Sequence, residues 1–83
     1  MSTTQYINTG VSFEEISFVE EGDVIVLEGW HFLVEKVTVD QKNQEMEIRM
    51  TVNDSDSSLA ILAQGVTVIY TVRKNGNNSL VRY

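Results

Sequence analysis

The amino-acid sequence predicts an all-β domain, folded as a small closed or nearly closed barrel of five to six short antiparallel strands. Three observations predict this class: apolar runs of strand length, turn signals of the hairpin type between them, and a single stray helical turn. A chain of 83 residues is long enough for one domain and too short for two.

The N-terminal residues differ in character from the rest of the chain. Residues 1–10 are mostly small and polar, which predicts a flexible arm ahead of a single domain at residues 11–83. Residues 11–18 leave two alternatives open. Ser12 with Glu15 three positions later matches a capping box, which begins a helical turn, and the same stretch could instead enter as a strand. We favour a short turn that leads into an extended segment.

The first clear strand belongs to a hairpin. Glu21-Gly22-Asp23 predicts a turn, and Val24 to Leu27 is a β-branched run suited to burial on both faces. Glu28-Gly29 then connects this run to the next strand in a short hairpin.

The second strand, from about Trp30 to Val39, is predicted to be bent. Its alternation breaks after Val34, because Val37 falls on the opposite phase. One extra residue near Glu35-Lys36 would restore a single buried face, so we predict a bulge or sharp bend there. Barrels use such bends to turn corners.

The cleanest strand comes next, after a loop at residues 40–44. Residues 45–52 alternate strictly, and the inward positions are Met46, Ile48, Met50 and Val52. Beyond a polar loop at 53–58, the run at residues 59–64 lies between Ser58 as N-cap and Gly65 as C-cap, which predicts one short helical turn.

A C-terminal hairpin completes the predicted fold. Residues 66–72 form a strand, and Asn75-Gly76 is the strongest hairpin signal because both residues accept the positive φ of a type I′ turn. A two-residue turn there would set four pairs opposite each other: Lys74 and Asn77, Val72 and Ser79, Tyr70 and Val81, Val68 and Tyr83. Because the chain has no proline, an exposed edge strand would lack its commonest blocker and could recruit another chain.

The stretch from Phe18 to Val37 resembles a known type of small barrel. A Gly-Asp turn leads into an apolar strand, a short hairpin follows, and an aromatic-x-Val-x-x-Val strand comes after it. This pattern is similar to SH3-like barrels, including the short barrel proteins common in bacteriophages. The resemblance covers roughly Phe18 to Val72. It implies an SH3-like fold and a binding or assembly role, with no catalytic residues to carry over.

Charge and composition exclude several classes of function. The first 41 residues contain eight acids and one base, a net charge of −7, and the remainder contains four acids and five bases, a net charge of +1. Six dispersed bases among twelve acids make a poor footprint for phosphates, so we expect no direct binding to nucleic acid. The longest apolar run is far too short to span a membrane, and no signal peptide is visible. We expect a cytoplasmic or virion-associated protein.

The candidate site residues point to an interface rather than to chemistry. Trp30 and His31 follow the hairpin glycine, where an exposed Trp is a typical interface anchor; alternatively, Trp30 closes one end of the barrel and His31 faces water. The acidic residues Glu14, Glu15, Glu20 and Glu21 could dock on a basic surface, or they form a solvated edge.

No catalytic residue, metal site or cofactor is expected. The lone His31 has no partner set beside it in the sequence, and there is no cysteine. The acidic loop at 53–58 departs from the EF-hand pattern, because Leu59 stands where that pattern needs Gly and Gly65 where it needs Glu.

We therefore predict a non-enzymatic protein-interaction or assembly module, of bacteriophage structural or accessory type, that acts through exposed barrel edges and the Trp30 hairpin. Its partner is another protein or a second copy of the chain in a homo-oligomer. The alternative is an acidic inhibitor or nucleic-acid-mimicking decoy that blocks a basic protein surface.

Overall fold

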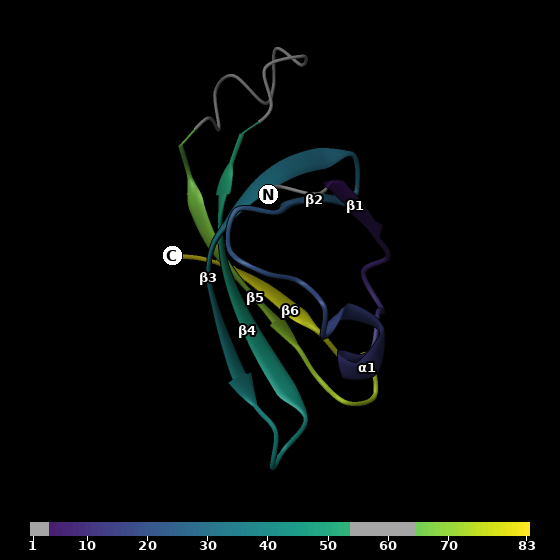
Figure 1. Ribbon diagram of the computed structural model, residues 1–83. Helices are drawn as coiled ribbons and strands as arrows, with labels where there is room; N and C mark the ends of the chain where they lie inside the picture. Colours follow the sequence, from purple (N-terminus) through teal and green to yellow (C-terminus); the bar gives the residue numbers. More distant parts are fainter. Residues whose placement is uncertain (1–3, 54–64) are drawn as a thin grey trace.

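The computed structural model describes residues 4–53 and 65–83, which form one curved sheet of six strands and one short helix (Figure 1). In chain order the elements are β1 (Thr4–Ile7), α1 (Phe13–Ile16), β2 (Val24–Leu27), β3 (Trp30–Asp40), β4 (Glu45–Val52), β5 (Thr67–Val72) and β6 (Ser79–Arg82). The prediction of an all-β domain is confirmed at a coarser level, because the described residues form a mostly-β domain with one short helix. The predicted helical turn at residues 59–64 lies outside the described residues.

The sheet is mixed, which the sequence does not predict. The strand order is β1-β2-β3-β4-β5-β6, and each pair is antiparallel except β1–β2, which is parallel. β1 lies within the segment expected to be a loose arm, and it pairs with β2 from Thr4 opposite Val24 to Ile7 opposite Leu27. A parallel neighbour requires a crossover, and residues 8–23, which include α1, supply it.

The expectation of a closed barrel is wrong. β1 and β6 occupy opposite ends of the sheet, and among the described strands no pairing joins them. The chain buries its core in another way. Val11, Phe13, Ile16 and Val19, in and around α1, belong to the same hydrophobic cluster as the inner faces of the central strands. Figure 1 shows α1 lying against the concave side of the sheet. The helix and its flanking turns therefore cover the core that closure would otherwise enclose.

The alternation of β4 is confirmed. Met46, Ile48, Met50 and Val52 are all buried, whereas the residues between them face the outer side of the sheet. Val68, Tyr70 and Val72 of β5 continue the buried layer in register with β4. A period of two is enough to orient these strands, because a slip of one residue would expose every apolar side chain at once.

The predicted bend in β3 is also confirmed. The pairing of β3 with β4 shifts between Val34 and Lys36, so Glu35 is the extra residue of a β-bulge. The short hairpin at Glu28-Gly29 is confirmed as well: the two residues have φ of 53° and 83°, the signs that a type I′ turn requires, and Leu27 lies opposite Trp30.

The predicted register of the C-terminal hairpin is wrong by one residue. Tyr70 lies opposite Leu80, not Val81, and Thr71 lies opposite Ser79. A type I′ turn needs positive φ at both central residues, and of the pair Asn75-Gly76 only Gly76 has it. The connection is instead a longer loop that begins with a turn in which the amide of Gly76 donates to the carbonyl of Arg73 at 3.0 Å.

A contact from the N-terminal segment explains this longer loop. The Asn78 amide nitrogen donates to the Val11 carbonyl at 2.7 Å, to the Thr9 carbonyl at 3.0 Å and to the Tyr70 hydroxyl at 3.1 Å. Its amide oxygen accepts from the backbone N–H of Arg73 at 2.8 Å. We call this network the Asn78 clasp. It ties residues 9–11 to the β5–β6 loop, and a tight two-residue turn would carry Asn78 out of reach.

Two further features surround the clasp. The Tyr70 hydroxyl donates to the Thr9 carbonyl at 3.0 Å, and burial raises the pKa of this phenol above its usual value of 10. The hydrogen bond from Asn78 opposes this rise, and the charge of Glu28 adds to it. Gly76 passes so close to Gly10 that a Cβ at position 76 would overlap the Gly10 carbonyl oxygen.

The alternative left open for residues 11–18 is decided in favour of helix. Ser12 precedes α1, and its backbone N–H and hydroxyl both donate to the Glu15 carboxylate, at 3.3 and 2.8 Å. Turns, rather than an extended strand, follow the helix before β2. The capping box is therefore a stronger local signal here than the alternation of apolar residues.

Candidate functional site

The strand β6 is an open edge of the sheet with exposed apolar side chains. Leu80, Val81 and Tyr83 are 46%, 58% and 71% exposed. We call residues 80–83 the β6 edge. Monomeric proteins usually protect such an edge with charge, proline or a bulge. Arg82 is the one charged residue here, and the regular register of β5 with β6 contains no bulge.

The backbone of the β6 edge offers unpaired hydrogen-bonding groups. The N–H of Tyr83 donates to the carbonyl of Thr67 at 2.9 Å, so Tyr83 directs its N–H toward β5. In an antiparallel ladder alternate residues face the neighbouring strand. Val81 therefore also faces β5, and the N–H and C=O groups of Leu80 and Arg82 point outward. An added strand could bond to these four groups.

Tyr83 is held in place from the outer face of the sheet. The guanidinium carbon of Arg49 lies 4.2 Å from the centre of the Tyr83 ring, a cation–π contact worth about 0.5–1 kcal/mol at an exposed position. Arg49 Nε in turn lies 3.7 Å from a carboxylate oxygen of Glu35, whose other oxygen accepts from the Thr51 hydroxyl. The bulge residue Glu35 thus helps to anchor Tyr83, which follows β6, through Arg49.

A hollow of about 200 Å³ lies beside this stack, and it has the character of a polar contact surface. We call it the outer hollow; its lining residues are Lys36, Thr38, Glu47, Arg49, Ile69 and Tyr83. Two cations face one carboxylate, and none of the lining residues is a histidine, serine or cysteine. This arrangement can hold a polar side chain of a partner.

The structure places the predicted Trp30 and His31 differently from the exposed-anchor interpretation. Both residues are half-buried at the start of β3, and Trp30 packs against the hydrophobic core. The His31 carbonyl accepts from the N–H of Asn53 at 2.9 Å. Trp30 therefore contributes to core packing. The alternative interpretation, in which it closes one end of a barrel, does not apply to this open sheet.

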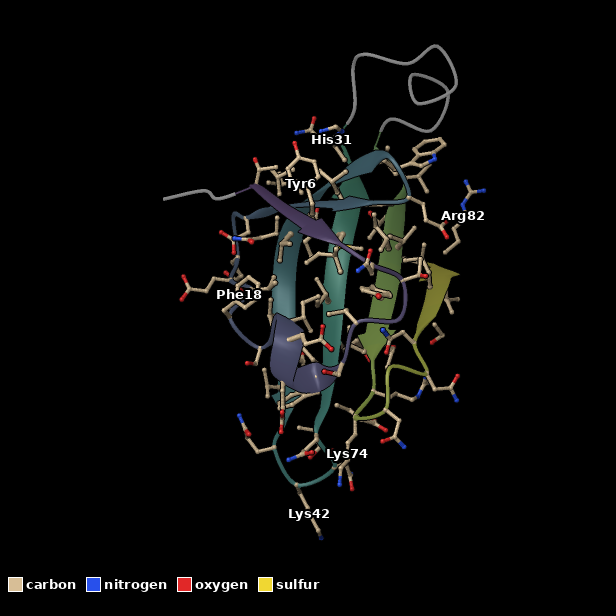
Figure 2. All side chains as sticks on the ribbon, turned by 90° about the vertical axis from the view of Figure 1, so that its right-hand side faces the viewer. Tyr6, Phe18, His31, Lys42, Lys74 and Arg82 are labelled. Atoms are coloured by element: carbon tan, nitrogen blue, oxygen red, sulfur yellow. The ribbon has the colours of Figure 1, made fainter. Side chains whose placement is uncertain are left out.

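The four predicted acids lie together on one segment. Glu14, Glu15, Glu20 and Glu21 are all exposed on α1 and the turns that follow it, and we call them the acidic turn. Phe18 lies between the two pairs and is 51% exposed. In Figure 2, Phe18 lies on one side of the molecule and His31 lies at one end.

The described residues contain no candidate centre for metal chemistry. No group of three or more His, Cys, Asp or Glu side chains gathers within residues 4–53 and 65–83. In the same part of the chain, no helix has the length and hydropathy to cross a membrane. The loop considered for calcium lies, apart from Asn53, outside the described residues.

Sequence reasoning did not single out Leu80, Val81 or Tyr83 as interface residues. The available signal was the apolar pair Leu80-Val81 in the predicted C-terminal hairpin. Arg49 and the outer hollow gave no signal, because an outward arginine on an alternating strand is ordinary. The role of Asn78 depends on residues 67 and 69 positions away.

Comparison with protein-family models, curated proteins and solved structures finds no match to this chain. Its function is therefore inferred from its residues and their geometry.

Proposed function

We propose that this protein is a non-enzymatic interaction or assembly module that binds another polypeptide chain through the open edges of its sheet, chiefly β6. One observation carries the proposal: exposed apolar side chains and outward-facing backbone groups coincide on the β6 edge. The resemblance to small bacteriophage proteins implies the same kind of role, and a structural or accessory function in a virus is part of the proposal.

The other edges of the sheet support the choice of β6. The second half of β3 pairs with β4 on one side only, but its bulge and charged residues Glu35, Lys36 and Asp40 protect it. β1 carries no charge, and Tyr6 on it is 80% exposed. β1 is therefore the second edge at which a partner could add a strand.

An alternative function has a specific observation in its favour. On the acidic turn the exposed Phe18 lies between two pairs of carboxylates. An aromatic anchor surrounded by acids suits a basic partner surface, as expected of an inhibitor or decoy.

One capture experiment separates the two functions. The tagged protein is incubated with an extract of its source organism, and the captured proteins are compared among three variants. Val81→Lys places a charge on the β6 edge; the combined substitution of Glu14, Glu15, Glu20 and Glu21 by Gln neutralises the acidic turn and keeps a capping side chain at position 15. Gln41→Lys adds the same charge as Val81→Lys in the exposed β3–β4 loop and is the control.

We expect Val81→Lys alone to lose the partner. Loss with the Gln variant alone, together with residual binding that depends less on salt than wild-type binding does, would replace the proposal with the inhibitor function. Retention of every partner by both variants would refute both.

A further inference from the structure

We propose that the β6 edge pairs with the β6 edge of a second copy of this chain, so that two sheets join across a two-fold axis. This inference rests on the proposed function and names the partner for the edge. Two-fold dimers are the commonest oligomers, and their interface uses the same surface on both subunits. An antiparallel pair of identical strands satisfies that symmetry.

The outward-facing groups restrict the register of such a pair. In an antiparallel ladder hydrogen-bonded residues lie opposite one another. Three registers join the groups of Leu80 and Arg82: Leu80 opposite Leu80, Leu80 opposite Arg82, and Arg82 opposite Arg82 of the second copy. The third sets like charges directly opposite and is unfavourable. The first leaves the exposed Val81 opposite Ser79.

The remaining register satisfies every constraint. When Leu80 lies opposite Arg82, the two copies of Val81 face each other across the axis as a non-hydrogen-bonded pair, the kind in which side chains approach most closely. Four backbone hydrogen bonds form, two at each Leu80–Arg82 pair. The aliphatic stem of Arg82 covers Leu80, so both exposed apolar residues of the strand become buried.

The charge distribution favours a second copy at this edge. Residues 65–83 contain three bases and no acid, whereas the β1 edge, which has no charged residue of its own, belongs to the half of the chain with a net charge of −7. Two copies of an acidic protein repel each other least where neither presents acids. The antiparallel arrangement also keeps the bases of the two β5–β6 loops apart, because Lys74 lies at the end of the molecule away from Arg82 (Figure 2).

The edge is ordered before any partner arrives. Tyr83 is fixed by its N–H bond to Thr67 and by the Arg49 stack. Less conformational entropy is therefore lost on pairing than for a loose tail. The contact is nevertheless small, and a dissociation constant in the micromolar to millimolar range is expected from its size.

Light scattering after size-exclusion chromatography tests the dimer. For the untagged wild type we expect the mass to rise from the 9.4 kDa of one chain toward twice that value between micromolar and millimolar concentration. Val81→Lys places two ammonium groups opposite each other and should weaken the dimer by about tenfold or more. Tyr6→Lys carries the same change on the β1 edge and should dimerise like the wild type. Circular dichroism checks that each variant is folded.

Single cysteines test the register, because the chain has none of its own. In a non-hydrogen-bonded pair the two Cα atoms are about 4.5 Å apart, which a disulfide can bridge. Val81→Cys should therefore form a covalent dimer on mild oxidation. Leu80→Cys places its two Cα atoms on a diagonal of about 7–8 Å, which is at or beyond the reach of a disulfide, and should cross-link poorly. Tyr6→Cys on the other edge should also cross-link poorly.

Each adverse result has a separate meaning. A wild type that stays monomeric at millimolar concentration overturns the inference, and so does a dimer that is lost in Tyr6→Lys but not in Val81→Lys. Faster cross-linking of Leu80→Cys than of Val81→Cys overturns the register. None of these results removes the proposed function, which fails only if capture of a partner is independent of Val81.

Discussion

Replacing Asn78 by alanine should weaken the whole fold, although this side chain lies in a loop and is only half-buried. The substitution removes every bond of the Asn78 clasp at once: one bond accepted from Arg73, and the bonds that two N–H groups share among Val11, Thr9 and Tyr70. The N-terminal segment would then lose its main polar attachment to the β5–β6 loop.

The size of the effect follows from the number of bonds. Three hydrogens take part, the two of the Asn78 amide and the backbone N–H of Arg73, so the loss equals about three hydrogen bonds at about 0.5–1.5 kcal/mol each. Water can reach the half-buried site and forms hydrogen bonds in place of some of those that are lost. The expected loss in the free energy of unfolding is therefore about 2–3 kcal/mol. A domain of this size has a total stability of about 4–12 kcal/mol. The melting temperature should therefore fall by about 10–20 °C.

Urea denaturation monitored by circular dichroism measures the loss, and the midpoint should fall without a change in slope. The matched control is Asn77→Ala. Asn77 is exposed, and its contact with the Arg73 side chain uses its backbone carbonyl, which alanine retains. The control should change stability by no more than about 0.5 kcal/mol. If Asn78→Ala is no less stable than this control, the clasp does not hold the N-terminal segment.

Two further predictions concern the same region. Gly76→Ala should lower the free energy of unfolding by about 1–3 kcal/mol more than Gly29→Ala does. Both glycines have positive φ, but only a Cβ at position 76 meets the backbone of Gly10. Equal losses of stability for the two variants in urea denaturation would contradict this prediction. Stability should also fall as pH rises above about 10. The pKa of Tyr70 is raised in the folded state, chiefly by burial, so the hydroxyl of the unfolded chain ionises at a lower pH than that of the folded chain. The free energy of unfolding therefore decreases between the unfolded and the folded pKa. Tyr70→Phe should show a shallower alkaline decline in melting temperature, and an unchanged decline would refute the assignment.

Local features of the fold were predictable because their causes lie within a few residues. The alternation of β4 needs only a period of two, and the bulge at Glu35 follows from a break in that period. The turn at Glu28-Gly29 was predictable in place, although a glutamate at φ 53° is not an obvious choice for it.

Features that depend on distant contacts were not predictable. The Asn75-Gly76 signal predicts a two-residue turn, but Asn78 forms its bonds with residues near position 10, and these bonds set the longer loop. The candidate site likewise has one feature that was predictable from neighbouring residues and one that depends on distant contacts. The sequence predicted an exposed edge strand able to recruit another chain, whereas the identity of that strand depended on which two strands were left at the ends of the sheet.

The sequence by itself determined the strands from β2 to β5, which of their side chains face inward and where β3 bends, because hydrophobic alternation is a property of neighbouring residues; it did not determine β1. Only the tertiary structure decided that the sheet stays open and that β6 lies at its edge. The physical reason is that α1 and its flanking turns bury the core beside the sheet, so closure has nothing further to gain, and the groups on β6 are left unpaired.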